Sequence, residues 1–571
     1  MGVGPVTRGT AKPQSERDYP GNWRLAGGID HDAQGLVVSG YAALPFAVAL
    51  FLNFGAKGSA WLKALRETVK ITPANERKQK SAAAIAFTST GLAEVLPEDI
   101  AEGVLLTFAL PFQEGMLQKS RSQRLGDTGE SLATPVPEWS GNGQKGIDRD
   151  SAVITALTVH GLLILYDENS GALGPHADSV KALLAEHQVK VVREILLDLQ
   201  ADANGIPHEH FGFADGISQP IPFGPGTTTR YGGEYPRDPV HGVPLGEILL
   251  GYENAQGEIP PGPIVVGALG YEDARWDPDD PGKQSKGSWP RDPSSGNDGS
   301  AASLADKTTQ ANVAGLKALG LTQDSAVHGD LGRNGTYLVV RELKQDVVQF
   351  WKSMDREAQS LNECTGGSSV ITADWLAARI VGRTKDGALL CPGGQMAPDT
   401  AGQPKNDALF FHDDHHGIGC PLGSHVRRSN PRDGLAKDGA SCADILHAAN
   451  NHRILRRGRK FGPPVKDPRE DYSERGLLFM CINTDIERQF EFIQQNWVLN
   501  QHFATLFGEA DPLVGRRGPM TLPAVPLRRT VNVDTYVTFI GGEYFFLPSI
   551  CALNYFGALQ PAAGKKTAGR Q

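Results

Sequence analysis

An acidic residue between two glycines is the first feature of the sequence that could carry chemistry. Asp215 lies three positions after Gly212 and directly before Gly216. Glycines permit a tight backbone turn and add no side-chain bulk, so a ligand could approach this carboxylate closely. On its own, however, the pattern is more typical of an ordinary turn than of a reactive site.

A second segment, residues 411–433, concentrates side chains that bind metals. It contains His412, His415, His416, Cys420 and His425. Such a set could assemble a zinc or iron site, although its spacing fits no closed zinc pattern. His425 differs from the others, because it lies among small residues and is followed by Arg427, whose guanidinium pairs well with carboxylates. This arrangement suits a neutral imidazole that faces an anionic cofactor.

A third segment, residues 451–462, is rich in arginine and lysine. A run of charges usually forms a solvated face. Alternation around Ile454 and Leu455 would nevertheless turn Arg456 toward the interior, and a buried guanidinium needs an anion or a polar ligand.

Taken together, the three segments resemble the dye-decolorizing peroxidases, a family of haem enzymes. Residues 212–216 match the G-x-x-D-G motif of that family. Residues 420–428 resemble its segment with the proximal haem histidine, and residues 454–458 resemble its segment with the distal arginine. The segments occur in the same order, and the resemblance extends over residues 32–556, with a long middle insertion as in the larger members.

The resemblance implies a role for four polar residues. Asp215 and Arg456 would be catalytic: the carboxylate moves a proton between the two peroxide oxygens, and the guanidinium stabilises the charge on the departing oxygen. His425 would ligate the haem iron. Asp511 would accept a hydrogen bond from the second nitrogen of His425 and make the imidazole more electron-rich.

The resemblance also implies residues that contact the cofactor without binding iron. Arg427 is expected to pair with a haem propionate. Leu477 and Phe479 are expected to form an apolar wall of the distal pocket, although ordinary core packing explains them equally well.

The expected function is a peroxidase with one non-covalently bound haem b per chain. It would reduce hydrogen peroxide and oxidise bulky phenolic or dye-like donors through a ferryl-oxo intermediate. Two alternatives are open. One is a haem carrier or iron-releasing protein on the same fold with little turnover. The other is a non-haem metallohydrolase that uses His412, His415 and His416.

The elements that position these residues follow a repeated pattern of strands and helices. In the first half we expect strands at 35–40, 83–89, 103–108, 157–166 and 189–197, with helices at 44–52 and 178–187. In the second half, strand–helix pairs are expected at 336–354 and 477–498, followed by a hairpin of strands 535–539 and 544–547 around a Gly-Gly turn. The pattern predicts an α+β fold of two halves, each an antiparallel sheet with helices on one face. By resemblance, these are tandem ferredoxin-like halves of the dimeric α+β barrel type.

Five segments divide the chain. They are a polar tail (1–30), an N-terminal half (31–223), a connector rich in Pro, Gly, Asp and Ser (224–330), a haem-binding C-terminal half (331–560) and a second polar tail (561–571).

Length, composition and charge restrict the class of protein. The 571 residues, with 40% hydrophobic and 21% charged side chains, are ordinary for a globular protein of two or three domains. The net charge of −9 argues against an extended surface for nucleic acid or anionic membranes. No apolar stretch resembles a signal peptide or a membrane span, so a cytoplasmic location is expected. The oligomeric state is left open.

Overall fold

The structure is a computed structural model of the chain. It describes residues 23–55, 58–76, 79–127, 136–141, 155–199, 206–229, 232–238, 240–266, 276–277, 280–284, 328–364, 371–390, 411–436, 442–523 and 528–559. None of the helices in these ranges is long and apolar enough to cross a membrane.

Within the described residues, eight strands form a closed ring. They are β2 (Phe46–Phe54), β3 (Ser81–Phe87), β6 (Gly161–Asp167), β7 (Val189–Asp198), β15 (Thr336–Gln345), β17 (Arg459–Phe461), β18 (Gly476–Asn483) and β21 (Val537–Leu547). Hydrogen-bonded neighbours follow the order β15, β18, β17, β7, β2, β6, β3 and β21, and β21 pairs with β15 again. The sheet therefore closes into a barrel.

The two halves of the barrel have the same topology. In the N-terminal half the spatial order is β7, β2, β6, β3, and in the C-terminal half it is β21, β15, β18, β17. If the four strands of each half are numbered along the chain, both halves have the spatial order 4-1-3-2. All these neighbouring strands are antiparallel. This is the ferredoxin-like arrangement repeated twice, so the predicted α+β fold is confirmed.

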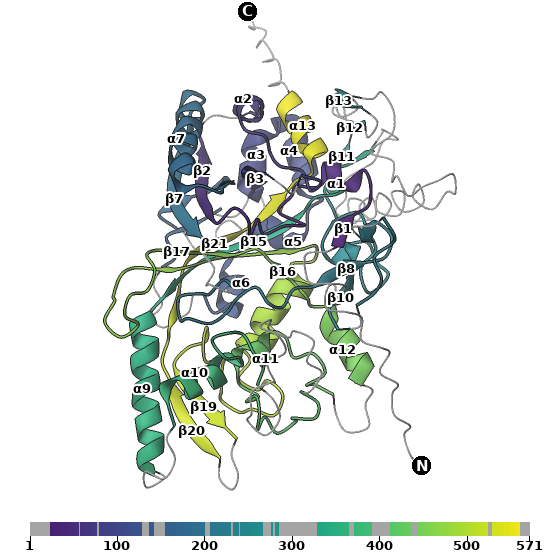
Figure 1. Ribbon diagram of the computed structural model, residues 1–571. Coiled ribbons are helices and arrows are strands. Elements are labelled where there is room, and N and C mark those ends of the chain that lie inside the picture. The colour runs from purple at the N-terminus through teal and green to yellow at the C-terminus, as the bar shows by residue number, and fades with distance from the viewer. Residues whose placement is uncertain are drawn as a thin grey trace, which may run out of the picture.

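Helices cover the barrel on opposite sides. Those around the N-terminal half include α2 (Ala60–Thr68), α3 (Ser89–Val95), α4 (Glu98–Leu105), α7 (Ser170–Glu186) and α13 (Ile550–Ala558). Those of the C-terminal half are α9 (Val347–Cys364), α10 (Ala373–Val381), α11 (His425–Ser429) and α12 (Cys442–Asn450). In Figure 1, α9, α10 and α11 gather below the sheet with the hairpin of β19 (Gly518–Leu522) and β20 (Arg529–Val533), away from α2, α7 and α13.

Short elements complete the described chain. The strands are β1 (Trp23–Leu25), β4 (Trp139–Ser140), β5 (Leu157–Thr158), β8 (Ile221–Phe223), β9 (Thr227–Thr229), β10 (Gly242–Pro244), β11 (Ile264–Val266), β12 (Trp276–Asp277), β13 (Asp280–Gln284), β14 (His328–Asp330) and β16 (Leu455–Arg456). The helical segments are α1 (Ile29–Asp32), α5 (Leu110–Glu114), α6 (Lys119–Arg124), the 3-10 turn η3 (Leu245–Glu247), and two consecutive π-helical segments, η6 (Glu487–Glu491) and η7 (Ile493–Val498).

Several element predictions in the N-terminal half are wrong. Residues 44–52 were expected to form a helix, but residues 46–54 form strand β2. Val48 and Leu50 pack into one buried cluster, whereas Ala49 and Phe51 pack into another on the opposite face of the sheet. A strand buried on both faces is a continuous apolar run, which hides its period of two. Residues 35–38 form turns rather than a strand, and residues 103–105 belong to helix α4.

The predicted hairpin near the C-terminus is also wrong. Residues 537–547 form the single long strand β21, which runs through the Gly-Gly pair. A Cβ atom on Gly541 would lie 2.4 Å from the ring of Trp139. This glycine therefore allows close packing against an aromatic ring and does not form a turn.

Candidate functional site

The structure contains a cavity of about 890 Å³ between the C-terminal half and the loop after β7. Its walls come from that loop, from helix α11, from strand β18 and from segment η7. Among the predicted site residues, those that line the cavity are Asp215, His425, Arg456, Leu477 and Phe479. Residues that the sequence singled out in distant segments therefore line the same cavity.

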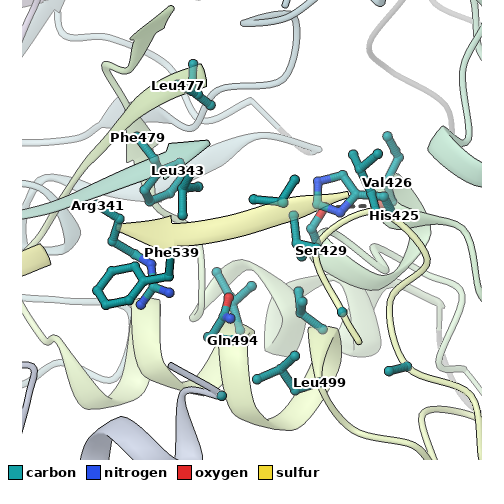
Figure 2. Close-up of a pocket in the computed structure, with 18 of the residues that line it drawn as sticks. Arg341, Leu343, His425, Val426, Ser429, Leu477, Phe479, Gln494, Leu499 and Phe539 are labelled. Carbon is teal, nitrogen blue, oxygen red and sulfur yellow. Dashed lines mark hydrogen bonds between the residues drawn. The ribbon is translucent and has the colours of Figure 1, made fainter. Parts of the chain in front are cut away.

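His425, the first residue of α11, lies at one end of this cavity (Figure 2). Its Nδ1 lies 3.0 Å from Oδ2 of Asp511. Asp511 is fully buried behind the cavity wall, and its other oxygen accepts the backbone N–H groups of Leu513 and Val514 at 2.9 and 3.0 Å. Asp511 therefore has a fixed position, accepts the Nδ1 proton and leaves Nε2 of His425 for another ligand.

Burial and charge act in opposite directions on this pair. Burial alone would lower the pKa of His425, but the Asp511 carboxylate outweighs it, and the pKa is raised. Burial would raise the pKa of Asp511, but the imidazole and the backbone N–H groups outweigh it, and the pKa is lowered. The contact therefore stabilises a negative carboxylate beside the imidazole.

Arg456 and Asp215 form an ion pair that lines the same cavity. Nη1 of Arg456 donates to Oδ1 of Asp215 at 2.9 Å, and Nη2 donates to the carbonyl of Ser218 at 3.2 Å. Oδ1 of Asp215 also accepts the N–H of Gly216 at 2.6 Å. Oδ2 of Asp215 has no hydrogen-bond partner among the described residues, which leaves it available to a ligand.

The backbone around Asp215 requires its two glycines. Gly212 and Gly216 have φ values of +96° and +75°, which residues other than glycine rarely adopt. The N–H of Asp215 donates to the carbonyl of Pro207 at 2.9 Å and closes the loop. The motif read from the sequence is therefore a conformational requirement of the turn that presents the acid.

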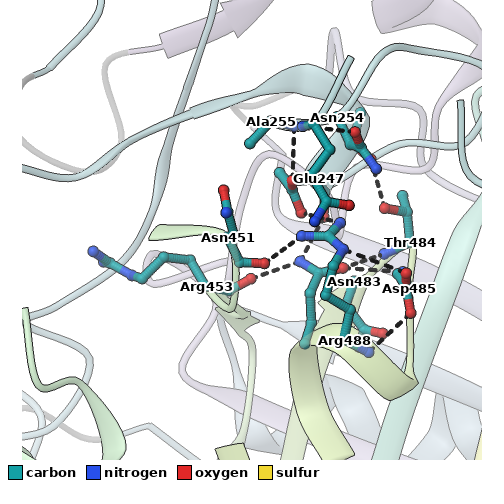
Figure 3. Close-up of polar contacts among 12 residues, drawn as sticks. Glu247, Asn254, Ala255, Asn451, Arg453, Asn483, Thr484, Asp485 and Arg488 are labelled. Atoms are coloured by element: carbon teal, nitrogen blue, oxygen red, sulfur yellow. Dashed lines mark hydrogen bonds and ion pairs between the residues drawn. The ribbon is translucent and has the colours of Figure 1, made fainter. Parts of the chain in front are cut away.

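The sheet holds Arg456, and a buried polar network holds the segment before it. Its strand, β16, pairs with β18, with Arg456 opposite Cys481. Close to this strand, Arg488 donates to Glu247 at 2.7 Å and also bonds the carbonyl of Asn451 (Figure 3). Glu247, fully buried, also accepts the N–H of Ala255 at 2.9 Å. These contacts fasten the connector to the segment that leads into Arg456.

The remaining walls are apolar at the side and hold an ion pair at one end. Leu477 and Phe479 project from β18 along one side of the cavity (Figure 2). At the end away from His425, Arg341 bonds Asp127 at 2.8 Å and stacks on the ring of Phe539 at 4.4 Å.

The structure places Arg427 outside the cavity. Its side chain is 1% exposed and does not line the cavity. Its guanidinium donates to the Asp414 carboxylate at 3.2 Å and to the carbonyls of Phe411, Cys420 and Asp414 at 2.8 to 2.9 Å. Because Nη1 and Nη2 bond groups inside this loop, Arg427 stabilises the loop before α11 in this structure.

Several arginines that line the cavity received no role from the sequence, and two of them lie near Arg456 or helix α11. Arg383 follows helix α10, and Arg453 lies three residues before Arg456. Burial, together with the positive neighbours Arg432 and Arg456, lowers the pKa of each to about 9. A surplus of positive charge therefore surrounds this part of the cavity. Arg383 belongs to no recognisable motif, and Arg453 lies in the basic segment 451–462, where the sequence alone does not show which arginines reach the cavity.

The histidines of the proposed metallohydrolase do not form a metal site. Among the described residues, which include His412, His415 and His416, no three metal-ligating side chains come together. These histidines also lie outside the cavity.

Comparison with known proteins gives a consistent set of relatives, although no family model matches the chain. The chain is 26% identical to the dye-decolorizing peroxidase msp1 of Mycetinis scorodonius, over 82% of this chain and 75% of that protein. It is 28% identical to the multifunctional dye peroxidase DyP2 of Amycolatopsis sp., over 74% of each chain.

Solved structures show the same fold. A DyP-type peroxidase of Anabaena sp. matches 92% of this chain and 94% of its own, with a TM-score of 0.62 and 22% identity. A dye-decolorizing peroxidase in complex with 2,6-dimethoxyphenol matches 92% and 98%, with a TM-score of 0.60 and 22% identity.

Proposed function

The chain belongs to the dye-decolorizing peroxidase family, and on that premise we propose that it uses one non-covalent haem b to reduce hydrogen peroxide and oxidise phenolic or dye-like donors. The observation that carries this proposal is the cavity itself. It combines an imidazole fixed by Asp511 with the ion pair of Asp215 and Arg456.

The residues around the cavity fit a haem. Its volume of about 890 Å³ lies within the range of about 300 to 1,000 Å³ typical of ligand sites. Nε2 of His425 would bind the iron, while Leu477 and Phe479 would contact the apolar macrocycle. Arg383 and Arg453, which line the cavity, are better placed than Arg427 to pair with the two propionates. When bound, haem supplies an iron centre that accepts the oxidising equivalents of peroxide and passes them to the donor.

Asp215 would move the proton of the peroxide. Its free Oδ2 accepts the proton from one peroxide oxygen and returns it to the other, which leaves as water. Arg456 orients the carboxylate through Oδ1 and stabilises the negative charge that develops on the leaving oxygen. The two residues thus divide proton transfer and charge stabilisation between them.

Asp511 would act on the iron ligand through His425. By accepting the Nδ1 proton it fixes the tautomer in which Nε2 is the ligand, and its charge raises the basicity of the imidazole.

Steady-state turnover tests this function directly. The haem-loaded protein is mixed with hydrogen peroxide and 2,6-dimethoxyphenol, a phenol found in complex with a structural relative. The proposal predicts saturable oxidation that depends on both substrates and greatly exceeds that of free haem. A protein that binds haem fully but oxidises the phenol no faster than free haem would instead be a haem carrier.

A further inference from the structure

Glu209 is a carboxylate of the cavity wall that the proposed mechanism does not use. It lies six residues before Asp215 and lines the same cavity. Its Oε1 accepts the N–H of Phe213 at 2.9 Å, and its Oε2 accepts the N–H of Phe211 at 2.8 Å. Oε2 also accepts a hydrogen bond from Nε2 of Gln345 at 2.8 Å. One side chain therefore receives three hydrogen bonds, two of them from the turn that leads to Asp215.

The backbone of Glu209 closes the same turn. Its N–H donates to the carbonyl of Phe213 at 3.0 Å, and its carbonyl accepts the N–H of Gly212 at 3.0 Å. Gln345 is the last residue of β15, so its bond to Glu209 connects the turn to the barrel. The turn has no regular secondary structure, and these contacts determine where the next residues lie.

The chemistry of the three donors requires a carboxylate at this position. A carboxylate offers two accepting oxygens, whereas a carboxamide of the same shape offers one oxygen and adds two donor hydrogens. With glutamine at 209, at least one of the three donors would face an N–H group. Burial, with a smaller contribution from the nearby Asp215, raises the pKa of Glu209 to about 7 against the effect of these donors. Two acids are thus kept close together despite their repulsion.

We propose that Glu209 is a positioning residue for Asp215: its carboxylate holds the turn of residues 209–213 so that the Asp215 carboxylate meets Arg456 in the cavity. The inference rests on the proposed peroxidase function. It differs from a merely structural role because the effect of Glu209 on the reaction must pass through Asp215.

The test begins with Glu209→Gln in the haem-loaded protein. We expect faster amide hydrogen exchange at Phe211 and Phe213, because their acceptors are lost or weakened. We expect kcat/KM for peroxide to fall about 10- to 100-fold, the scale for a catalytic group displaced by up to an ångström. The Soret absorbance and the KM for 2,6-dimethoxyphenol should not change.

A double-mutant cycle separates positioning from general destabilisation. If Glu209 acts through Asp215, Glu209→Gln should cause little further loss in a protein that already carries Asp215→Asn. Gln345→Met, which removes only the bond to the barrel, should give a smaller loss that also disappears in the Asp215→Asn background. This milder variant provides the test if Glu209→Gln does not fold.

Asp330→Asn is the matched control. Asp330 is buried, accepts the N–H groups of Gly332 and Arg333 at 3.1 and 3.0 Å, and does not line the cavity. Its replacement should lower stability without changing kcat/KM for peroxide.

Three results would overturn the inference. The first is unchanged amide hydrogen exchange at Phe211 and Phe213 in Glu209→Gln. The second is an unchanged kcat/KM for peroxide in that variant, and the third is a loss of kcat/KM that adds fully to the loss caused by Asp215→Asn. A wild-type protein without peroxidase turnover would contradict the proposed function instead. The exchange measurement, which needs no turnover, would then still decide whether Glu209 holds the turn.

Discussion

Replacing Arg456 by leucine should slow the reaction with hydrogen peroxide while haem stays bound. The substitution removes the 2.9 Å bond to Asp215 and the positive charge beside it, but no residue assigned to iron binding. Removal of one preorganised donor to a developing charge costs about 2.7 to 4 kcal/mol, or about 10²- to 10³-fold in rate. The Arg456 side chain is 34% exposed, so solvent screening places the expected effect near the lower end, about 10²-fold.

The assay is stopped-flow mixing of haem-loaded protein with peroxide, followed at the Soret band. Arg457→Leu is the matched control, because Nε and Nη2 of Arg457 donate to the carbonyls of Leu36 and Val37 at 2.7 and 2.6 Å. Nη1 of Arg457 donates to the backbone carbonyl of Arg456 at 3.2 Å, but Arg457 bonds neither side chain of the ion pair, so its loss should affect mainly stability. A large rate loss in Arg457→Leu or Arg453→Leu, with Arg456→Leu unaffected, would refute the assignment of Arg456.

Three further predictions concern iron binding and stability. His425→Ala should lose haem, because it removes the proposed protein ligand of the iron, and full Soret absorbance at matched haem supply would contradict that assignment. Asp511→Asn should keep haem but lose about 10- to 100-fold in affinity, measured by haem transfer to an acceptor protein, because the imidazole loses its carboxylate partner; an unchanged affinity would contradict this. His210 is 5% exposed, and burial lowers its pKa from 6.5 to about 4. Between these pH values the unfolded chain binds the extra proton, so the contribution of His210 to the free energy of unfolding is complete above pH 6.5 and falls by roughly 3 kcal/mol toward pH 4. Glu209, whose pKa is raised, makes the free energy of unfolding change with pH in the opposite direction. Denaturant unfolding of wild type and His210→Gln at several pH values separates the two effects, because only the contribution of His210 differs between these proteins. Parallel curves of unfolding free energy against pH would contradict the prediction.

The polar segments were easier to interpret from the sequence than the apolar ones. Gly212 and Gly216 have positive φ angles, so the backbone itself requires the residues that form the motif. By contrast, the apolar run of residues 44–52 contains no polar residue to mark a period. Whether such a run is a helix or a strand depends on what covers its two faces, and distant parts of the chain supply that cover.

The Gly-Gly pair near the C-terminus illustrates a second limit. Gly541 and Gly542 have the composition of a hairpin turn, yet both lie within β21. The reason for Gly541 is the ring of Trp139, about 400 residues earlier in the chain. A tertiary contact of this kind leaves no local signal.

Arginines were the least predictable part of the site. Arg427 follows His425 closely and suggests an anion partner, but the adjacent loop uses its donors. Arg383 reaches the cavity from a position without a motif, and Arg453 reaches it from within the basic segment 451–462. A guanidinium can satisfy its donors with backbone carbonyls or with a ligand, and only the packing around it decides between them.

The most direct test of the account is the second-order rate constant for the reaction of the haem-loaded protein with hydrogen peroxide, compared between wild type and Asp215→Asn. Asparagine keeps the shape of the side chain but cannot accept the proton, so the account predicts an unchanged resting haem spectrum and a loss of at least about 100-fold in rate. Equal rate constants for the two proteins would contradict it. Arg456 with water would then suffice, and Asp215 would only shape the turn.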